Sequence, residues 1–351
     1  MPDLSVVIVS WNVRDLLREC LRFVVGTPKG RGSRIGTSKG RESVASLDGS
    51  SLIPDPCSLA LEVIVVDNAS ADGSAAMVAA EFPAVRLIVS PVNRGFTGGN
   101  NLGLDAARGR YVFFLNPDTI ASQDALVTLV DYLETHADVG VVGPQLRHGD
   151  GRLQSSRRRF PTLLTALFES TPLEWHWPAN RWARWYRMED QGSGGRGQAA
   201  GVKGASESVG EEVDWLVGAA LMTRRAVLAQ VGGFDEGYFM YSEELDWCRR
   251  VKAAGWRIVY LPGAQITHYE GKSSEQVVAA RHIRFQTSKI RYFRKFHGPR
   301  AAGFLRAFIL GAFAVEWGLE ATKWLLGSKR ALRRDRMAAY RQLLASGLVD
   351  E

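Results

Sequence analysis

Short apolar runs alternate with amphipathic segments along the first half of the chain. The apolar runs predict strands at residues 4–9, 61–66, 85–89, 111–115 and 139–142. The segments between them predict helices at residues 15–25, 72–81, 98–107 and 123–135. Because the strand runs are almost continuously apolar, we expect both faces of the sheet to be buried. Strands separated by helices of about ten or more residues predict an α/β fold with a mostly parallel sheet and flanking helices.

Two segments interrupt this pattern. Residues 26–60 form the first, where positions 26–58 contain six Gly, seven Ser and five Lys or Arg. The second is residues 191–210, with seven Gly in twenty positions. Such compositions are typical of flexible surface insertions and mobile loops.

Regular patterning is weak between the two insertions and returns after the second. Residues 157–188 are rich in Trp, Arg and Pro, and their periodicity is poor. Further on, we expect patterned structure at 213–222, a helix at 242–254, a strand at 257–261, a long helix at 274–296 and one or two helices within 303–346.

The net charge of +7 is unevenly distributed. Residues 281–351 carry 15 Lys or Arg and 5 Asp or Glu, a net of +10, so the other residues sum to −3. A neutral-to-acidic body is unlike a nucleic-acid-binding core, and no nucleic-acid partner is expected. A basic C-terminal region favours contact with an anionic surface instead.

The three cysteines lie far apart in sequence, at positions 20, 57 and 248. They form neither a disulfide framework nor a zinc-type pair, which favours the reducing cytoplasm. The first residues form a strand-like run without a basic segment before it, so we expect no signal peptide there.

Polar side chains follow three of the predicted strands. Ser10 and Asn12 follow the first strand, Asp67 the second, and Asn116 and Asp118 the strand that ends at 115. In an open parallel sheet the ligand site lies outside the carboxyl ends of the strands, so these side chains are expected on one rim.

A Gly- and Asn-rich turn at residues 93–101 opens a predicted helix. Its sequence is NRGFTGGNN, which exposes backbone N–H groups to an anion at the start of the helix. The turn is not GxGxxG and the chain has no GxxxxGK[ST], so dinucleotide binding and P-loop chemistry lose their main support.

Six motifs in order resemble the family 2 glycosyltransferases, which have the nucleotide-binding GT-A fold. They are SVVIVSWN, VIVVDNASADGS, NRGFTGGNNLG, FLNPDT, the segment from DWLVGAALM to EELDWCRRVKAAGW, and THYEGKS. Among the members, the bacterial rhamnosyl- and galactofuranosyltransferase-like enzymes are the most similar. The resemblance implies a GT-A catalytic domain over residues 1–275, with the two insertions. It leaves residues 276–351 as a basic, amphipathic helical region.

The resemblance also implies a donor site and a divalent metal. The donor-binding residues would be Ser10, Asn12, Asp67, Asn68, Gly98, Gly99, Asn116 and Asp118. Asp67 and Asn68 would hold the nucleoside, and the two glycines would let the backbone approach the donor. Asp118 and His268 would hold the metal, which bridges the sugar-nucleotide diphosphate. An imidazole ligand favours Mn²⁺ over Mg²⁺.

The acidic cluster at residues 243–246 corresponds to the acceptor side of the family's site. Inverting transfer needs a carboxylate that takes the proton of the acceptor hydroxyl. Glu244 stands at the position of that base, and Asp246 is the reserve candidate. Glu243 and Trp215 are the candidate acceptor-binding residues. A solvated acidic helix face for the cluster, and core packing for Trp215, remain the alternatives.

These features predict an inverting, metal-dependent glycosyltransferase. It would transfer a sugar from a nucleoside-diphosphate donor to a hydroxyl of a cell-envelope or polysaccharide glycan, which is free or lipid-linked. By resemblance alone, rhamnose from dTDP-rhamnose is the favoured donor sugar. A nucleotidyltransferase is one alternative, although SWN stands where its Gly-rich basic loop would follow the first strand. A degenerate, non-catalytic sugar-binding protein is another, because Asn116 replaces the first acid of the metal motif.

The C-terminal region predicts a helix that lies on a membrane surface. Residues 303–326 are largely apolar but contain charges, each of which costs about 2.5–3.5 kcal/mol at a bilayer centre. Glu316, Glu320 and Lys323 share one helix face, and the opposite face holds apolar groups such as Val315 and Leu319. We therefore expect a cytoplasmic protein, peripheral on the inner face of the cell membrane. A helical hairpin packed on the catalytic domain, or on a second copy in a homo-oligomer, is the competing interpretation.

Overall fold

The computed structural model describes residues 1–26, 59–178, 180–189, 209–269, 278–327 and 329–349. The predicted insertions at 26–60 and 191–210 lie almost wholly outside these residues, as do the last residues of the THYEGKS motif.

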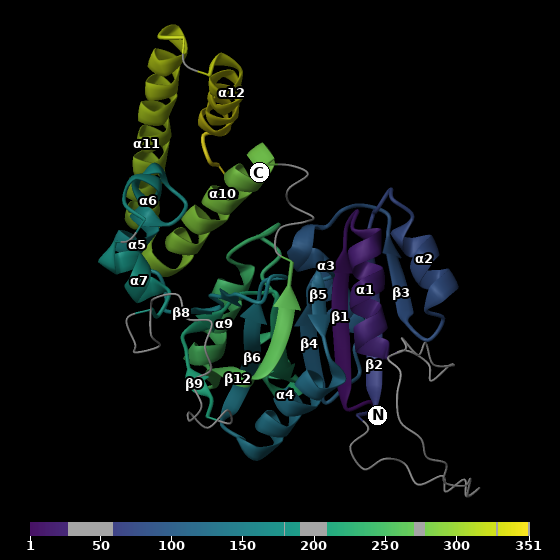
Figure 1. The fold of residues 1–351 in the computed structure, drawn as a ribbon. Coiled ribbons are helices and arrows are strands. Elements are labelled where there is room, and N and C mark those ends of the chain that lie inside the picture. Colours follow the sequence, from purple (N-terminus) through teal and green to yellow (C-terminus); the bar gives the residue numbers. More distant parts are fainter. Residues whose placement is uncertain (27–58, 179, 190–208, 270–277, 328, 350–351) are drawn as a thin grey trace, which may run out of the picture.

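A mixed sheet forms the centre of the molecule, with its strands in the order β3-β2-β1-β4-β11-β6-β12-β5 (Figure 1). Their bounds are Leu4–Ser10 (β1), Leu61–Asn68 (β2), Arg86–Ser90 (β3), Tyr111–Leu115 (β4), Thr119–Ala121 (β5), Val139–Arg147 (β6), Ala220–Arg224 (β11) and Arg257–His268 (β12). Strands β3, β2, β1 and β4 run parallel, and so do β6 and β12, whereas β11 and β5 are antiparallel to their neighbours. The predicted α/β fold with a mostly parallel sheet and flanking helices is confirmed.

Four very short strands complete the sheets. Leu153–Gln154 (β7) pairs with β6, and Glu211–Glu212 (β9) pairs with β12. Arg157–Arg158 (β8) and Trp215–Leu216 (β10) form a separate two-stranded ribbon.

Helices cover both faces of the sheet. Their bounds are Arg14–Val25 (α1), Ser74–Glu81 (α2), Gly95–Ala106 (α3), Gln123–Thr135 (α4), Leu163–Phe168 (α5), Pro172–His176 (α6), Arg181–Tyr186 (α7), Arg225–Val231 (α8), Glu243–Ala253 (α9), Val278–His297 (α10), Pro299–Leu325 (α11) and Arg330–Ser346 (α12). The three short helices α5–α7 were not predicted from the weak periodicity of residues 157–188. Side-chain caps start two of them, because Thr162 and Asn180 accept backbone N–H groups at the beginnings of α5 and α7.

The alternation of side chains along the strands produces two hydrophobic cores, one on each face of the sheet. In β1, Val6 and Ile8 belong to the core that includes α1 and α4, whereas Val7 belongs to the core on the other face. All three side chains are fully buried. Burial on both faces explains why the strand runs are apolar throughout rather than alternating.

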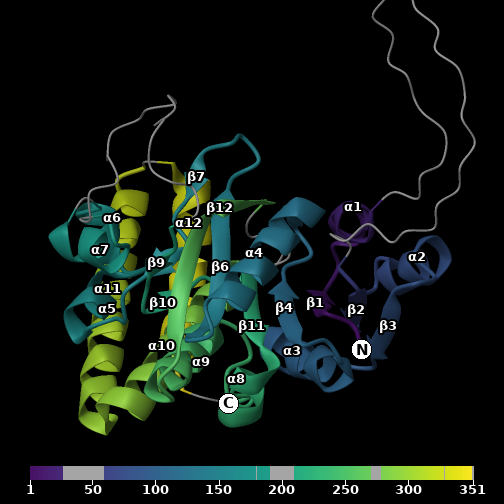
Figure 2. The same cartoon turned by 90° about the horizontal axis from the view of Figure 1, so that it is seen from below.

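The C-terminal helices share the second core with the sheet. Tyr292 and Phe293 of α10 and Leu305 of α11 belong to the same buried cluster as Trp247 of α9. Figures 1 and 2 place α10–α12 together with α5–α7, beside the half of the sheet that contains β6 and β12. The C-terminal region therefore packs on α9, where Arg249 Nη1 donates to the Tyr292 hydroxyl at 2.7 Å, and on the short helices α5 and α6.

Candidate active site

One pocket collects polar side chains from the carboxyl ends of the strands and from α9 and α10. Its lining residues are Val9, Trp11, Asn68, Asn93, Gly95, Phe96, Asn116, Pro117, Asp118, Val217, Gly218, Ala219, Phe239, Met240, Tyr241, Glu243, Glu244, His268, Arg281 and Arg284. The sequence predicted six of these as site residues, from four separate motifs: Asn68, Asn116, Asp118, Glu243, Glu244 and His268.

Asp118 and His268 face each other across one side of the pocket. The antiparallel register of β5 and β12 pairs His268 with Thr119, which brings the imidazole next to Asp118. His268 Nε2 lies 3.3 Å from Asp118 Oδ1, and both side chains are almost fully buried. The other ring nitrogen, Nδ1, is 3.1 Å from Gln154 Oε1. With a proton on Nδ1 donated to Gln154, Nε2 presents a lone pair toward the carboxylate.

Asn116 completes this group. Its backbone N–H donates to Ala219 O at 2.9 Å, which holds the turn after β4 against the loop before β11. Its amide nitrogen is 3.5 Å from His268 Nε2, and its Oδ1 is buried without a hydrogen-bond partner among the described residues. An unpartnered buried oxygen beside a carboxylate and an imidazole is unusual and calls for a ligand.

The glycines of the turn at 93–101 have a packing role in the structure. A Cβ on Gly99 would lie 2.6 Å from Val9 Cγ1, and one on Gly98 would lie 2.9 Å from Arg94 Cβ. These glycines therefore let α3 pack closely on β1 and turn tightly, and neither lines the pocket. Gly95 does line it, with φ of +72° and its Cα against the carbonyl of Phe239.

Asn68 holds this turn in place. Its side-chain nitrogen donates to Gly95 O at 2.8 Å and to Asn93 Oδ1 at 3.0 Å. Its oxygen accepts the backbone N–H of Arg94 at 2.9 Å. Asn68 is thus a structural clamp as well as a lining residue.

Ser10 and Asp67 occupy paired positions at the carboxyl ends of β1 and β2. Both are buried behind the pocket rather than lining it, yet Ser10 Oγ and Asp67 Oδ1 have no hydrogen-bond partner among the described residues. Asn12 has a structural task, because its Oδ1 accepts the backbone N–H of Ala71 at 2.7 Å and its backbone N–H donates to Ser70 Oγ at 3.0 Å.

Glu243 and Glu244 begin α9 and line the same pocket as Asp118 and His268. One oxygen of each is buried with no hydrogen-bond partner in the part of the chain that the structure describes, and the backbone N–H of Gly218 donates to the other oxygen of Glu244 at 3.4 Å. Burial raises the pKa of Glu244, and burial together with the neighbouring Glu244 charge raises the pKa of Glu243 well above its ordinary value. Two non-glycine residues with positive φ, Tyr241 and Ser242, precede the helix. Such backbone strain is found where the surrounding structure fixes a functional geometry.

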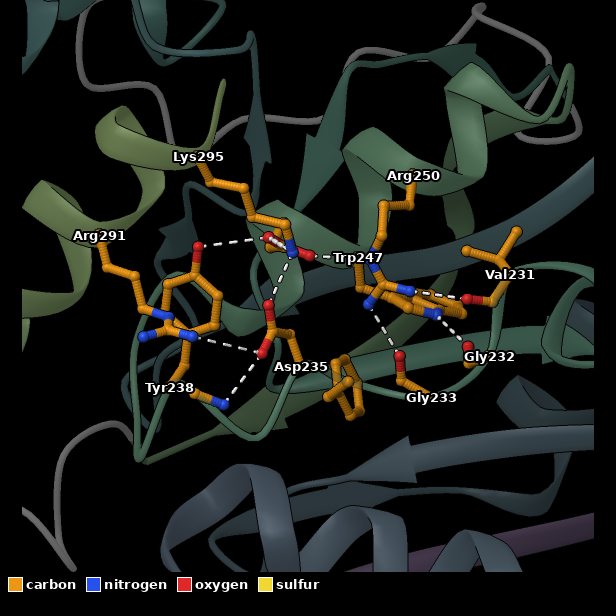
Figure 3. Close-up of polar contacts among 12 residues, drawn as sticks. Val231, Gly232, Gly233, Asp235, Tyr238, Trp247, Arg250, Arg291 and Lys295 are labelled. Atoms are coloured by element: carbon orange, nitrogen blue, oxygen red, sulfur yellow. Dashed lines mark hydrogen bonds and ion pairs between the residues drawn. The ribbon is translucent and has the colours of Figure 1, made fainter. Parts of the chain in front are cut away.

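Asp246, the reserve candidate for the base, points away from the pocket into an ion-pair network. Its carboxylate accepts Arg250 Nε at 2.8 Å, pairs with Lys295 Nζ at 2.7 Å, and accepts the Tyr238 hydroxyl at 3.2 Å. Lys295 also pairs with Asp235 at 2.7 Å (Figure 3). Asp246 therefore joins α9, α10 and the 234–241 loop, and its oxygens are occupied.

Trp215 lies in the hydrophobic core and not among the pocket-lining residues. It is 7% exposed, and its indole N–H donates to Arg159 O at 2.9 Å. The core-packing alternative describes its position, because β10 turns this side chain toward the α5–α7 layer, where it lies beside Tyr186.

Three polar residues of the site were not predicted from the sequence. Arg281 and Arg284 come from α10, beyond the motifs, and line the pocket. Gln154, on the short strand β7, orients His268. Only the tertiary placement of α10 and β7 reveals them, although the basic composition after residue 281 was a general signal.

Comparison with known proteins identifies relatives over most of the chain. A family model described as glycosyl transferase family 2 matches residues 5–191. The chain is 30% identical over 281 residues to the N-acetylglucosaminyl-diphospho-decaprenol L-rhamnosyltransferase of Mycobacterium tuberculosis, a match that covers 77% of this chain and 86% of that protein. It is 29% identical over 185 residues to the rhamnosyltransferase WbbL of Escherichia coli, which covers 50% of this chain and 61% of that protein.

A solved structure shares the fold. The mannosyltransferase PcManGT from Pyrobaculum calidifontis, in complex with GDP-Man and Mn²⁺, aligns with a TM-score of 0.50 at 18% identity, covering 99% of this chain and 88% of that one. At this identity the likeness concerns the fold alone.

Proposed function

This chain belongs to glycosyl transferase family 2 and is a glycosyltransferase, and we propose that it is an inverting enzyme that needs a divalent metal. The observation that carries this proposal is the pocket itself, which Asp118 and His268 line together with Glu243 and Glu244. A metal–diphosphate site and a carboxylate base are the two parts that inverting transfer from a nucleotide sugar requires.

The residues present fit a divalent cation. Asp118, His268 and Asn116 offer a carboxylate oxygen, an imidazole nitrogen and an unpartnered amide oxygen. Within the described residues no group of three or more His, Cys, Asp or Glu is arranged to hold a metal, so diphosphate oxygens and water would complete the coordination. Gln154 orients the imidazole, as the outer partner of a histidine ligand typically does. The cation would neutralise charge on the leaving diphosphate, and the imidazole ligand favours Mn²⁺.

Glu244 is the proposed base. It would take the proton of the acceptor hydroxyl while that oxygen bonds to the anomeric carbon. The bond from this carbon to the diphosphate breaks on the opposite face, and its electron pair leaves with the diphosphate. A raised pKa makes Glu244 a stronger proton acceptor than an exposed glutamate, and the Gly218 N–H holds its other oxygen in place.

The nucleoside is proposed to lie against the ends of β1 and β2. The unpartnered oxygens of Ser10 and Asp67 support this placement, because buried polar atoms normally have partners. Asn68 and Asn12 support the site by shaping the loops around it.

The proposed donor is dTDP-rhamnose, and the proposed acceptor is a lipid-linked glycan of the cell envelope. Support comes from the rhamnosyltransferase relatives, one of which is named for an acceptor that carries a diphosphate and a polyprenol.

We also propose that the C-terminal region binds the cytoplasmic face of the cell membrane. Helix α11 is long and apolar enough to cross a membrane by length and composition. Its two acidic side chains are turned inward: Glu316 bonds to His176 at 2.7 Å, and Glu320 pairs with Arg333 at 2.6 Å. Burial opposes ionisation of Glu320, but its basic partners outweigh burial and lower its pKa.

The outward face of α11 is apolar. Phe304, Val315, Leu319 and Leu326 are exposed, with Val315 at 64% and Leu326 at 81%. Exposed basic groups lie nearby on and before α12: Lys329, Arg330, Arg334, Arg336 and Arg341. An apolar face flanked by cations suits an anionic bilayer surface, each cation adding about 1 kcal/mol.

Vesicle co-sedimentation of the full chain tests this, with Val315→Asn/Leu319→Asn as the variant. Loss of pelleting supports the membrane, whereas concentration-dependent dimers that the variant abolishes would place a second copy on this face.

The activity is tested by nucleotide release and thermal shift over a panel of sugar nucleotides, with and without Mn²⁺. Ligands that bind only the folded state raise the melting temperature. Stabilisation by dTDP and dTDP-rhamnose that depends on Mn²⁺ supports the proposal. Equal shifts in melting temperature with every nucleotide, whether or not Mn²⁺ is present, would contradict the proposal.

A further inference from the structure

Helix α10 presents a row of polar and basic side chains to the 234–241 loop. Spacings of three and four residues place these groups on one face of the helix: Arg281, Arg284, Ser288, Arg291 and Lys295. At the C-terminal end of the row, the charges are paired. Lys295 Nζ lies 2.7 Å from Asp235 Oδ2 and 2.7 Å from Asp246 Oδ2, and Arg291 Nη2 lies 3.7 Å from Asp235 Oδ1 (Figure 3). This end of the row holds the loop against α9.

The N-terminal end of the row is different. Arg281 and Arg284 line the pocket and are half-buried, and neither has an acidic partner among the residues that the structure describes. A guanidinium presents N–H donors in a fixed planar fork that matches phosphate oxygens. Two such groups at the wall of a pocket provide a site for an anion.

Arg284 is held in position by aromatic stacking. Its guanidinium carbon lies 4.3 Å from the centroid of the Phe239 ring. Phe239 is fixed in turn, because its carbonyl accepts the backbone N–H of Phe96 at the start of α3 at 2.9 Å. One turn further along α10, Ser288 Oγ donates to Met240 O at 2.8 Å. Stacking occupies the face of the guanidinium and leaves its N–H edges for a ligand.

Cations are also needed to balance the negative charge of the pocket and of its proposed substrates. Three carboxylates line it, from Asp118, Glu243 and Glu244, while its substrates in the proposed reaction are diphosphates. We propose that Arg281 and Arg284 form a diphosphate-binding site on the α10 wall of the pocket, a role that rests on the proposed function. Two substrates carry this chemistry: the nucleotide donor and a diphosphate-linked acceptor. The proposed metal residues lie in the turn between β4 and β5 and at the end of β12, whereas α10 packs along α11, whose outward face is apolar, which favours the acceptor's diphosphate.

The test compares Arg281→Gln/Arg284→Gln with wild type in the full chain. Arg22→Gln is the control, because it removes the same kind of charge from the exposed surface of α1, where the side chain is 59% exposed. Steady-state kinetics use Mn²⁺, the donor and two acceptors: N-acetylglucosamine on a short lipid diphosphate, and the same sugar on a neutral alkyl chain. Arg284→Lys keeps the charge but loses the fork, so it should recover only part of the effect.

We expect the double variant to raise the KM for the diphosphate acceptor about tenfold or more, with kcat, donor KM and neutral-acceptor KM within about twofold of wild type. A selective rise in the KM of the donor and in the Kd of its nucleoside diphosphate assigns the same site to the donor. The site would be refuted if the double variant left the KM values of the diphosphate acceptor and of the donor unchanged. It would also be refuted if Arg22→Gln raised these KM values as much as the double variant does.

A separate binding measurement keeps the site testable if the proposed reaction fails. Calorimetric titration with inorganic pyrophosphate, without metal, needs no turnover. Wild type and Arg22→Gln should bind pyrophosphate with the same Kd, and the double variant should bind at least about tenfold more weakly. Equal Kd values for all three proteins refute the site, whatever sugar the enzyme transfers.

Discussion

His268 Nε2 lies 3.3 Å from a carboxylate oxygen of Asp118, although the two residues belong to distant segments of the chain. The backbone explains the contact. Strand β12 extends to His268, pairs it with Thr119 of β5, and the N–H of Tyr269 then donates to Asp118 O at 2.9 Å. With the ring proton on Nδ1 and donated to Gln154 Oε1, Nε2 and the carboxylate oxygen are both acceptors, and a cation between them satisfies both.

Asp118→Asn should abolish metal-dependent nucleotide binding. The substitution keeps the volume of the side chain but removes the only carboxylate of the metal group. Calorimetric titration with dTDP and Mn²⁺ measures the loss, which we expect to be about 100-fold or more, given the affinity changes seen when metal-site groups are altered. Asp72→Asn is the control, because Asp72 bonds to the first N–H of α2 and does not line the pocket. Unchanged affinity in Asp118→Asn would refute the assignment.

Glu244→Gln should lower kcat by roughly 10²–10⁴-fold, the usual contribution of a general base, and leave donor binding intact. Asp246→Asn should act mainly on stability, because it removes the buried carboxylate that pairs with Arg250 and Lys295. The cost should be about 1–3 kcal/mol, since both cations are partly exposed and Lys295 keeps Asp235. Thermal denaturation and single-turnover rates separate the two. A stable Asp246→Asn variant with the larger loss of kcat would transfer the role of base to Asp246.

The buried carboxylates also predict a pH dependence. The pKa of Glu244 is raised, so it becomes protonated, and the enzyme inactive, at a higher pH than an exposed glutamate would give. The rate should therefore fall as pH decreases through this raised pKa. The pH profile of kcat/KM reports the transition, and it should disappear from the residual activity of Glu244→Gln.

Glu243→Gln should stabilise the protein at high pH. The pKa of Glu243 is raised in the folded state, so this group destabilises the fold progressively as pH rises from its unfolded pKa to the raised folded pKa, and costs nothing below the unfolded value. The variant should melt roughly 1–3 °C above wild type at pH 8, and the difference should shrink to zero as pH falls toward 4. A gain that persists unchanged at pH 4 would show that the charge is not its cause.

Two glycine substitutions should change stability in opposite directions. Gly99→Ala places a Cβ 2.6 Å from Val9 Cγ1 and should destabilise by about 1–3 kcal/mol. Gly303→Ala, in α11, meets no atom within 4 Å and should stabilise by about 0.5–1 kcal/mol. Chemical denaturation measures both. If Gly99→Ala did not change the free energy of unfolding, α3 would have to be able to move away from β1.

Part of the site could be predicted from local sequence, because Asn116 and Asp118 directly follow an apolar strand. His268, Glu243 and Glu244 were predicted from the motifs that resemble the glycosyltransferase family, since the predicted strand at 257–261 ends before His268. In a parallel sheet these positions converge, and the pocket brings the five together.

The remaining features depend on tertiary contacts. The network of Asp246 depends on Lys295, and the pocket position of Arg284 depends on Phe239, both through the docking of α10 on the 234–241 loop. Hydrophobic periodicity within one helix cannot predict such a docking. For α11, periodicity separated an acidic face from an apolar face. It could not show that the acidic face turns inward, because its partners His176 and Arg333 belong to other helices.

The most direct measurement is the configuration of the product formed from dTDP-rhamnose and a diphosphate-linked N-acetylglucosamine acceptor with Mn²⁺. Nuclear magnetic resonance of the purified product reports the anomeric centre. We expect one added rhamnose with the configuration opposite to that of the donor, formed by wild type and almost lost in Glu244→Gln. Retention of the donor's configuration, or equal product from wild type and Glu244→Gln, would contradict inverting transfer with Glu244 as base.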